Sequence, residues 1–171
     1  MNRFKSIFSL LLLVMVSFSA SVFAGSATAV MTNTATVNGG CTISTSGFSA
    51  SYDPVSANAT LPADANIGVT TTCTTGLTAT ITLGQGANAG SGSTDAIPVR
   101  RLSNGAGGYL TYSIMTDVTH ATTWGNTAGT GQTSTGLGVP VTLTGYARIP
   151  AGQTSAAAGA YTDTVVATVS F

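Results

Sequence analysis

Apolar and polar residues alternate with a period of two along most of this chain. The pattern is clearest where Leu77, Ala79, Ile81 and Leu83 are separated by threonines. Such a period in segments rich in Thr and Val is typical of β-strands, because successive side chains of a strand point to opposite faces of its sheet. The pattern predicts extended chain at residues 41–43 and strands at residues 48–52, 65–75, 77–83, 97–102, 109–117 and 139–148.

The connections between these segments are short and rich in turn residues. Gly76 stands between residues 65–75 and 77–83 and predicts a hairpin formed by those two strands. No amphipathic helix of useful length is found in the pattern. About seven short strands joined by turns indicate an all-β fold, a sandwich of immunoglobulin-like type.

A further strand is predicted at residues 27–37, which contain no Pro, Gly or charged residue. At about 3.3 Å per residue this segment would span on the order of 36 Å, which is long for a strand of one small domain. It can pair either with its own sheet or with the edge of another molecule. One of its faces carries Ala27, Ala29, Met31, Asn33, Ala35 and Val37.

The last predicted strand covers residues 161–171 and shows the same alternation. One face carries Tyr161, Val165, Ala167, Val169 and Phe171. The opposite face is mostly threonine, and the sequence ends at Phe171 while it is still in the phase of the strand. This segment is therefore expected to place a row of apolar side chains against the core.

The first 24 residues are predicted to be a secretory signal peptide. Arg3 and Lys5 give it a positive start, and residues 7–16 are largely apolar. The small residue Ala24 places the expected cleavage site before Gly25. The apolar stretch is too short to span a membrane. The sequence thus predicts an exported protein whose mature part has the size of one domain.

Charged residues are scarce throughout the chain. They make up 6% of it, whereas ordinary globular domains contain about 25%. Without the signal peptide, three Arg face five Asp, with no Lys and no Glu. A partner that requires a basic patch, such as nucleic acid or anionic lipid, is thereby excluded. A surface this poor in charge is more typical of a protein packed in an assembly, because net charge aids the solubility of free proteins.

The two cysteines, Cys41 and Cys73, are expected to form a disulfide in an exported protein. Closing a loop of about 32 residues contributes roughly 3.7 kcal/mol on the chain-entropy estimate. The alternative is a pair of free thiols, one of which could be catalytic. The oxidising compartment favours the disulfide.

Residues suited to catalysis or metal binding are few. His120 is the sole histidine, and no nucleophile-elbow sequence accompanies it. With both cysteines bridged, a metal would have only this histidine and Asp residues as ligands. The sequence therefore predicts no enzyme activity, no metal and no cofactor, with His120 on a surface loop.

Two other groups have competing interpretations. Trp124 opens the Gly-rich segment 124–138 and either packs in the core or stacks on a sugar. Arg100 and Arg101 indicate a solvated strand end. Only sugar stacking by Trp124 would point to a binding function.

Three stretches together resemble the spore coat protein U domain family, which includes pilins of archaic, Csu-type chaperone–usher fimbriae. The first is V-N-G-G-C-T at residues 37–42, and the second is V-T-T-T-C at residues 69–73. The third and most specific is the final G-A-Y-T-D-T-V-V-A-T-V-S-F at residues 159–171. The resemblance covers essentially the whole mature chain, although its middle matches only by strand pattern.

The resemblance implies an incomplete immunoglobulin-like β-sandwich, completed by a donated strand. Residues 25–40 would be the donor extension and residues 41–171 the pilin domain. In that domain the C-terminal strand would line the acceptor groove with Tyr161, Val165, Ala167, Val169 and Phe171. A periplasmic chaperone would lend a strand first, and at an outer-membrane usher another pilin subunit's extension would replace it. The implied location is a fimbrium on a Gram-negative cell, with a role in adhesion or biofilm formation.

Two points stay open on this interpretation. The donor face is small and polar for its role, so either the acceptor pockets are shallow or Val30 on the other face marks a different register. The function also has alternatives: a non-fimbrial spore-coat or surface-layer protein of the same family, or a secreted carbohydrate-binding module. Neighbouring chaperone and usher genes would indicate a fimbria, and an exposed aromatic cluster near Trp124 and Tyr109 would indicate a sugar-binding module.

Overall fold

The computed structural model describes residues 24–171, so the predicted signal peptide lies outside the described residues except for Ala24. The chain divides into two units, Met1–Ala35 and Thr36–Phe171, and all the assigned strands belong to the second. No helix is found among the described residues, hence none that could cross a membrane. The strands are β1 (Cys41–Ser46), β2 (Ala63–Cys73), β3 (Thr78–Leu83), β4 (Arg100–Ser103), β5 (Tyr109–Met115), β6 (Gln132–Thr135), β7 (Val141–Ile149) and β8 (Ala167–Ser170).

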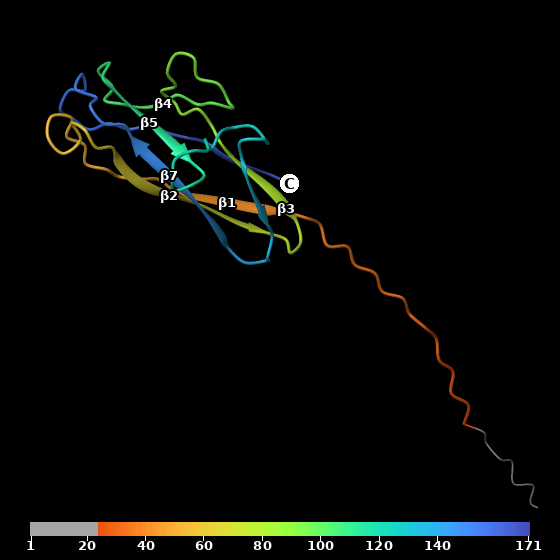
Figure 1. Cartoon of the computed structure of the whole chain (residues 1–171). Coiled ribbons are helices and arrows are strands. Elements are labelled where there is room, and N and C mark those ends of the chain that lie inside the picture. Colours follow the sequence, from red (N-terminus) through yellow and green to blue (C-terminus); the bar gives the residue numbers. More distant parts are fainter. Residues whose placement is uncertain (1–23) are drawn as a thin grey trace, which may run out of the picture. The chain divides into compact units, whose positions relative to one another are not determined.

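The strands form two antiparallel sheets (Figure 1). The larger sheet has the order β1-β2-β7-β5-β4, and the smaller has the order β6-β3-β8. Side chains from both sheets meet in one apolar core, for example Val69 of β2, Ile81 of β3 and Ile114 of β5. Alternating strands bury one face of each sheet against the other, which confirms the predicted all-β sandwich.

The predicted hairpin at Gly76 is wrong, although both of its strands exist. β2 lies in the larger sheet and β3 in the smaller, so the turn carries the chain from one sheet to the other. Gly76 has φ +81°, a conformation that favours glycine, and its N–H donates to the carbonyl of Gly136 rather than across a hairpin. Alternation identifies two strands that follow each other in the sequence, but it does not show whether they pair with each other.

One strand was missed and another does not form. β6 lies inside the segment expected to be a loop, because its sequence Q-T-S-T has no apolar alternation. It is an edge strand that pairs only with β3 within the described residues. Residues 48–52 form no strand; instead Phe48 packs edge-on against Tyr112, and the Tyr52 hydroxyl donates to the Pro150 carbonyl at 2.7 Å.

Arg100 is not a solvated strand end, because its side chain is fully buried. Its Nε donates to the Gly84 carbonyl at 2.9 Å, and its Nη2 donates to the carbonyls of Leu83 and Trp124 at 2.8 Å each. Burial lowers the pKa of Arg100 from its usual value, yet an Arg side chain stays charged in proteins. The charged group therefore ties β4 to two loops of the opposite layer.

Arg101 is half-buried and also binds backbone. Its Nε and Nη2 donate to the carbonyls of Asn88 and Ala89 at 3.0 Å each. Its guanidinium lies 4.0 Å from the ring centroid of Tyr109, a cation–π arrangement. Both arginines are thus structural, and the expectation of a solvated pair is wrong for this strand.

Candidate functional site

A hollow of about 360 Å³ opens between the two sheets. It is bounded on one side by the end of β1 and on the other by the C-terminal segment. Its apolar walls come from both layers, and they include Phe48, Ile67, Val69, Tyr112, Ile114 and Val165. A close-packed core normally leaves no space of this size, so the sandwich is open along this side.

The strands that border this hollow are both sheet edges. In the described part of the chain β1 pairs only with β2, and β8 pairs only with β3. Each edge therefore presents a row of backbone groups that an additional strand could use. Apolar side chains beneath the edges, among them Ile43, Val165 and Val169, are only partly buried.

The C-terminal segment keeps its predicted alternation but not its predicted strand length. Only residues 167–170 form β8, paired with β3. Odd-numbered residues from Tyr161 to Val169 are half-buried, and even-numbered residues are exposed. Tyr161, Val165 and Ala167 line the hollow, Val169 packs against the core, and Phe171 is 61% exposed.

Asp163 holds this segment in place through hydrogen bonds to Tyr112 and Asn88, and it was not among the predicted site residues. Its Oδ2 accepts from the Tyr112 hydroxyl at 2.8 Å, and its Oδ1 accepts from the Asn88 N–H and Nδ2 at 3.2 and 3.1 Å. Burial, and then the hydrogen bond to Asp163, raise the pKa of Tyr112 far above its usual range. The sequence does indicate a special role for Asp163, because it lies on the inward face of the C-terminal segment, which is otherwise apolar.

A second hollow of about 750 Å³ adjoins the first. The two share Phe48, Leu102, Tyr161 and Thr162 as lining residues. The second continues beneath residues 156–160. We call the two hollows together the inter-sheet groove, and its inner surface is mainly apolar.

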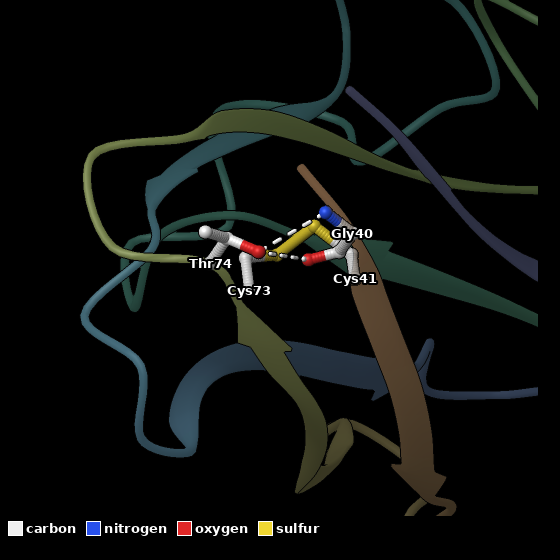
Figure 2. The surroundings of a disulfide bond; sticks show 4 residues. All are labelled: Gly40, Cys41, Cys73 and Thr74. Atoms are coloured by element: carbon white, nitrogen blue, oxygen red, sulfur yellow. Dashed lines mark hydrogen bonds between the residues drawn. A yellow bond between two sulfur atoms is a disulfide. The ribbon is translucent and has the colours of Figure 1, made fainter. Parts of the chain in front are cut away.

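The predicted disulfide between Cys41 and Cys73 is confirmed (Figure 2). The two residues lie directly opposite each other in the β1–β2 pair. Beside the bridge, the Thr74 N–H donates to the Gly40 carbonyl at 3.0 Å, and the Gly40 N–H donates to Thr74 Oγ1 at 3.1 Å. The bridge therefore anchors the edge strand β1 at the point where the N-terminal segment joins the sandwich.

Replacing Cys41 and Cys73 together with Ala should lower the free energy of unfolding by about 2–4 kcal/mol, because the unfolded chain regains the entropy of an open loop. Urea unfolding of the purified protein measures this. The parent protein unfolded under reducing conditions is the control and should match the variant. An unchanged midpoint in both samples would contradict a stabilising bridge.

The N-terminal segment forms no strand within the single chain. Residues 24–40 have no strand assignment, and their side chains are exposed. Val30 is 98% exposed, Met31 81% and Val37 82%. The donor role of this segment remains a prediction.

The described residues offer little for catalysis or metal binding. Among residues 24–171 no group of three or more His, Cys, Asp or Glu could hold a metal ion. His120 is not freely exposed, since its side chain retains 9% exposure beside Tyr146 and its Nε2 lies 3.8 Å from Asp64 Oδ1. Trp124 is fully buried and its Nε1 donates to the Ile81 carbonyl, which leaves it a packing role and no exposed face for a sugar.

The family model for the Spore Coat Protein U domain matches residues 27–168. The chain is similar to Protein U of Myxococcus xanthus, with 42% identity over 165 residues that cover 92% of this chain and 91% of that protein. The fold is similar to a chain in the crystal structure of the CsuC–CsuE chaperone–tip adhesion subunit pre-assembly complex from archaic chaperone–usher Csu pili of Acinetobacter baumannii. That match has a TM-score of 0.55 and 18% identity.

The structural match covers 80% of this chain but only 40% of the other, so this chain spans about two fifths of that length. At this level of identity the similarity concerns the fold. The family match includes the N-terminal segment from residue 27 and most of the sandwich. The protein therefore belongs to the Spore Coat Protein U domain family.

Proposed function

We propose that this protein is a structural shaft subunit of a surface fimbria, in which residues 25–37 of one copy fill the inter-sheet groove of the next. The observation that carries the proposal is the open groove itself. It runs between two sheet edges, and the apolar side chains of the C-terminal segment beside it are only half-buried. A strand inserted there would complete both the hydrogen bonding and the core.

The N-terminal segment has the properties of such a strand. It alternates, has no Pro or Gly from residue 27 to residue 37, and is exposed in the single chain. Burial of a side chain such as Met31 or Val37 contributes roughly 1.5–3 kcal/mol, and Ala much less. Main-chain hydrogen bonds would supply affinity along the whole strand, and the two larger side chains would supply most of the apolar contribution.

An open groove needs an occupant before a second copy arrives, because exposed apolar surface and free strand edges promote aggregation. A periplasmic chaperone would lend a strand during export, and an outer-membrane usher would be the place of exchange. Support comes from the similarity of the fold to that in a chaperone–subunit pre-assembly complex. The finished polymer would lie on the surface of a Gram-negative cell and serve adhesion or biofilm formation.

A second candidate is a non-fimbrial coat or surface-layer protein. It is favoured by the similarity along almost its whole length to Protein U of Myxococcus xanthus and by the description of the family. Strand donation could join subunits in a coat as well as in a fibre. Electron microscopy of cells labelled with an antibody to this protein separates the two, since a fimbrial subunit gives thin fibres and a coat protein a continuous layer.

A peptide test addresses strand donation directly. We define the truncated domain as the mature chain without residues 25–37. Adding a synthetic peptide of residues 25–38 should raise its stability to urea, because a ligand that binds only the folded state stabilises it by mass action. At a peptide concentration of 100 Kd the gain should be about 2.7 kcal/mol.

The matched control is a peptide of the same length with Met31→Thr and Val37→Thr. It keeps the main chain but lacks the two large side chains of the donor face, so this peptide should stabilise the domain far less. Equal effects of both peptides, or no effect of either at saturating concentration, would contradict strand donation.

A further inference from the structure

We propose a direction and register for the donated strand: it runs antiparallel to the C-terminal segment of the receiving copy, with Asn33 opposite Asp163 and Met31 opposite Val165. This inference rests on the proposed function and adds to it the residues that fix how two copies fit together. It depends on a feature that the donor segment and the C-terminal segment share. One face of each carries a single polar residue among apolar side chains.

On the receiving side, the inward residues of the C-terminal segment differ in kind. Asp163 is the charged residue among them, and it is one of the residues that line the groove. Val165 follows two residues later and lines the same hollow together with Ile67 and Ile114 of the opposite layer. The segment therefore presents a polar position and an apolar hollow next to each other on one face.

On the donor side, the odd-numbered face of residues 27–37 has the same two features. Asn33 is its polar residue, and Met31 is its longest apolar side chain. They are separated by two residues, as Asp163 and Val165 are. In an antiparallel pair, placing Asn33 opposite Asp163 necessarily places Met31 opposite Val165, because opposing residues run in opposite directions along the two chains.

Other arrangements fail to match both features. A parallel strand with Met31 opposite Val165 sets Asn33 opposite Ala167, where the C-terminal segment offers no polar side chain. An antiparallel strand shifted by two residues sets Asn33 opposite Val165 and places an amide in the apolar hollow. Both arrangements leave the Asn33 amide without a polar partner. A buried amide without a partner is unfavourable, so both are disfavoured.

The carboxylate of Asp163 has capacity for the proposed contact. Its Oδ2 accepts one hydrogen bond, from the Tyr112 hydroxyl at 2.8 Å, whereas each oxygen of an ionised carboxylate can accept two. The Asn33 amide can donate to the remaining position. The contact gives Asn33 the hydrogen-bond partner that a polar residue on the donor face needs once it is buried.

The remaining positions also fit by size. Ala35 falls opposite the bulky Tyr161. Val37 falls opposite Gly159, where a Cβ would meet no atom within 4 Å and where the second hollow of about 750 Å³ begins. The register thus places a large side chain at each hollow and the small Ala35 opposite Tyr161, which lines both hollows.

Cysteine cross-linking in the full-length protein tests the register. Thr32 and Thr164 are both exposed, and they lie opposite each other in the proposed register, on the even-numbered faces of their segments. Directly opposed residues of antiparallel strands have Cα separations of about 4.5–5.5 Å, which a disulfide can bridge. A chain with Thr32→Cys and Thr164→Cys should give a ladder of covalent multimers on non-reducing gels after mild oxidation.

The matched controls combine Thr32→Cys with Thr162→Cys or with Val166→Cys, at exposed positions two residues away on either side. Their ladders should be at least about fivefold weaker, since a shift of two residues moves a partner by roughly 7 Å. The strongest ladder with either control, or fibres without a ladder at Thr164, overturns the register alone. Failure of the parent protein and of all variants to form multimers overturns the proposed function instead.

A charge-rescue test addresses the Asn33–Asp163 contact separately. In the peptide 25–38, Asn33→Asp places a second carboxylate beside Asp163 and should weaken binding to the truncated domain about tenfold at neutral pH. The truncated domain with Asp163→Asn should bind the Asn33→Asp peptide and the parent peptide within about threefold of each other. If Asn33→Asp weakened binding equally on the truncated domain and on its Asp163→Asn variant, the contact would be overturned. Removing the charge at Asp163 would then have restored no affinity, so the loss would come from the peptide's own charge alone.

Discussion

Deleting residues 25–37 should abolish polymerisation completely, while the intact mature protein forms fibres or strand-linked multimers. On the proposed function, one segment supplies both the main-chain hydrogen bonds and the side chains that fill the inter-sheet groove, whose apolar walls come from both sheets. Size-exclusion chromatography and negative-stain electron microscopy of both forms measure the difference.

The groove of the truncated domain stays intact, so this domain should still accept a strand. Added to the intact protein, it should act as a chain terminator and shorten the fibres in proportion to its share of the mixture. A complementary variant, Val165→Asp, places a charge in the apolar hollow and should donate but not accept. The two variants mixed should give dimers and nothing larger.

Two outcomes would contradict this expectation. Fibres formed by the truncated domain alone would show that another segment is the donor. A well-behaved monomer in both the intact and the truncated form would show that the sandwich needs no second copy. Folding of each variant is checked first by urea unfolding, so that loss of assembly is not confused with loss of the domain.

Replacing Arg100 with Met should lower the free energy of unfolding by roughly 3 kcal/mol, because a buried acceptor left without its donor costs about 1–3 kcal/mol and several carbonyls lose theirs together. Met fills most of the volume of the Arg stem but donates no hydrogen bonds. The carbonyls of Leu83, Gly84 and Trp124 would lose the donor that the guanidinium now provides. Equilibrium unfolding in urea gives the difference.

Arg101→Met is the matched control, because the neighbouring residue is only half-buried and its carbonyl partners lie in a more exposed loop. Its cost should stay near 1 kcal/mol, the typical net contribution of such hydrogen bonds. Similar losses for the two variants would contradict a special role of the buried guanidinium. A loss below about 1 kcal/mol for Arg100→Met would do so as well.

Alternation in the sequence predicted most of the strands because it follows from backbone geometry. β5 and β7 fall inside their predicted segments, or within one residue of them, since their apolar side chains recur every second position. The same rule fails for β6, whose four polar residues are held at an edge by pairing with β3. It also fails to identify partners, so the turn at Gly76 was taken for a hairpin.

The candidate site was predictable only in part. The inward face of the C-terminal segment follows from its alternation, and the disulfide follows from two cysteines in an exported protein. The position of Phe48 against Tyr112 and the contact of Asp163 with Asn88 join residues far apart in the sequence. Such contacts depend on tertiary packing, and so does the burial of Arg100, which composition would place at the surface.

On the proposed function, the disulfide between Cys41 and Cys73 bears on how a fibre of these subunits would carry load. A pull on the donated segment enters the sandwich at Gly40 and reaches the bridge one residue later. The covalent bond passes the force directly to the end of β2, a strand flanked by β1 and β7. The bridge closes a loop with a sequence separation of 32 residues, and this loop cannot be extended by the pull. Each subunit would therefore lengthen less if it unfolded under tension.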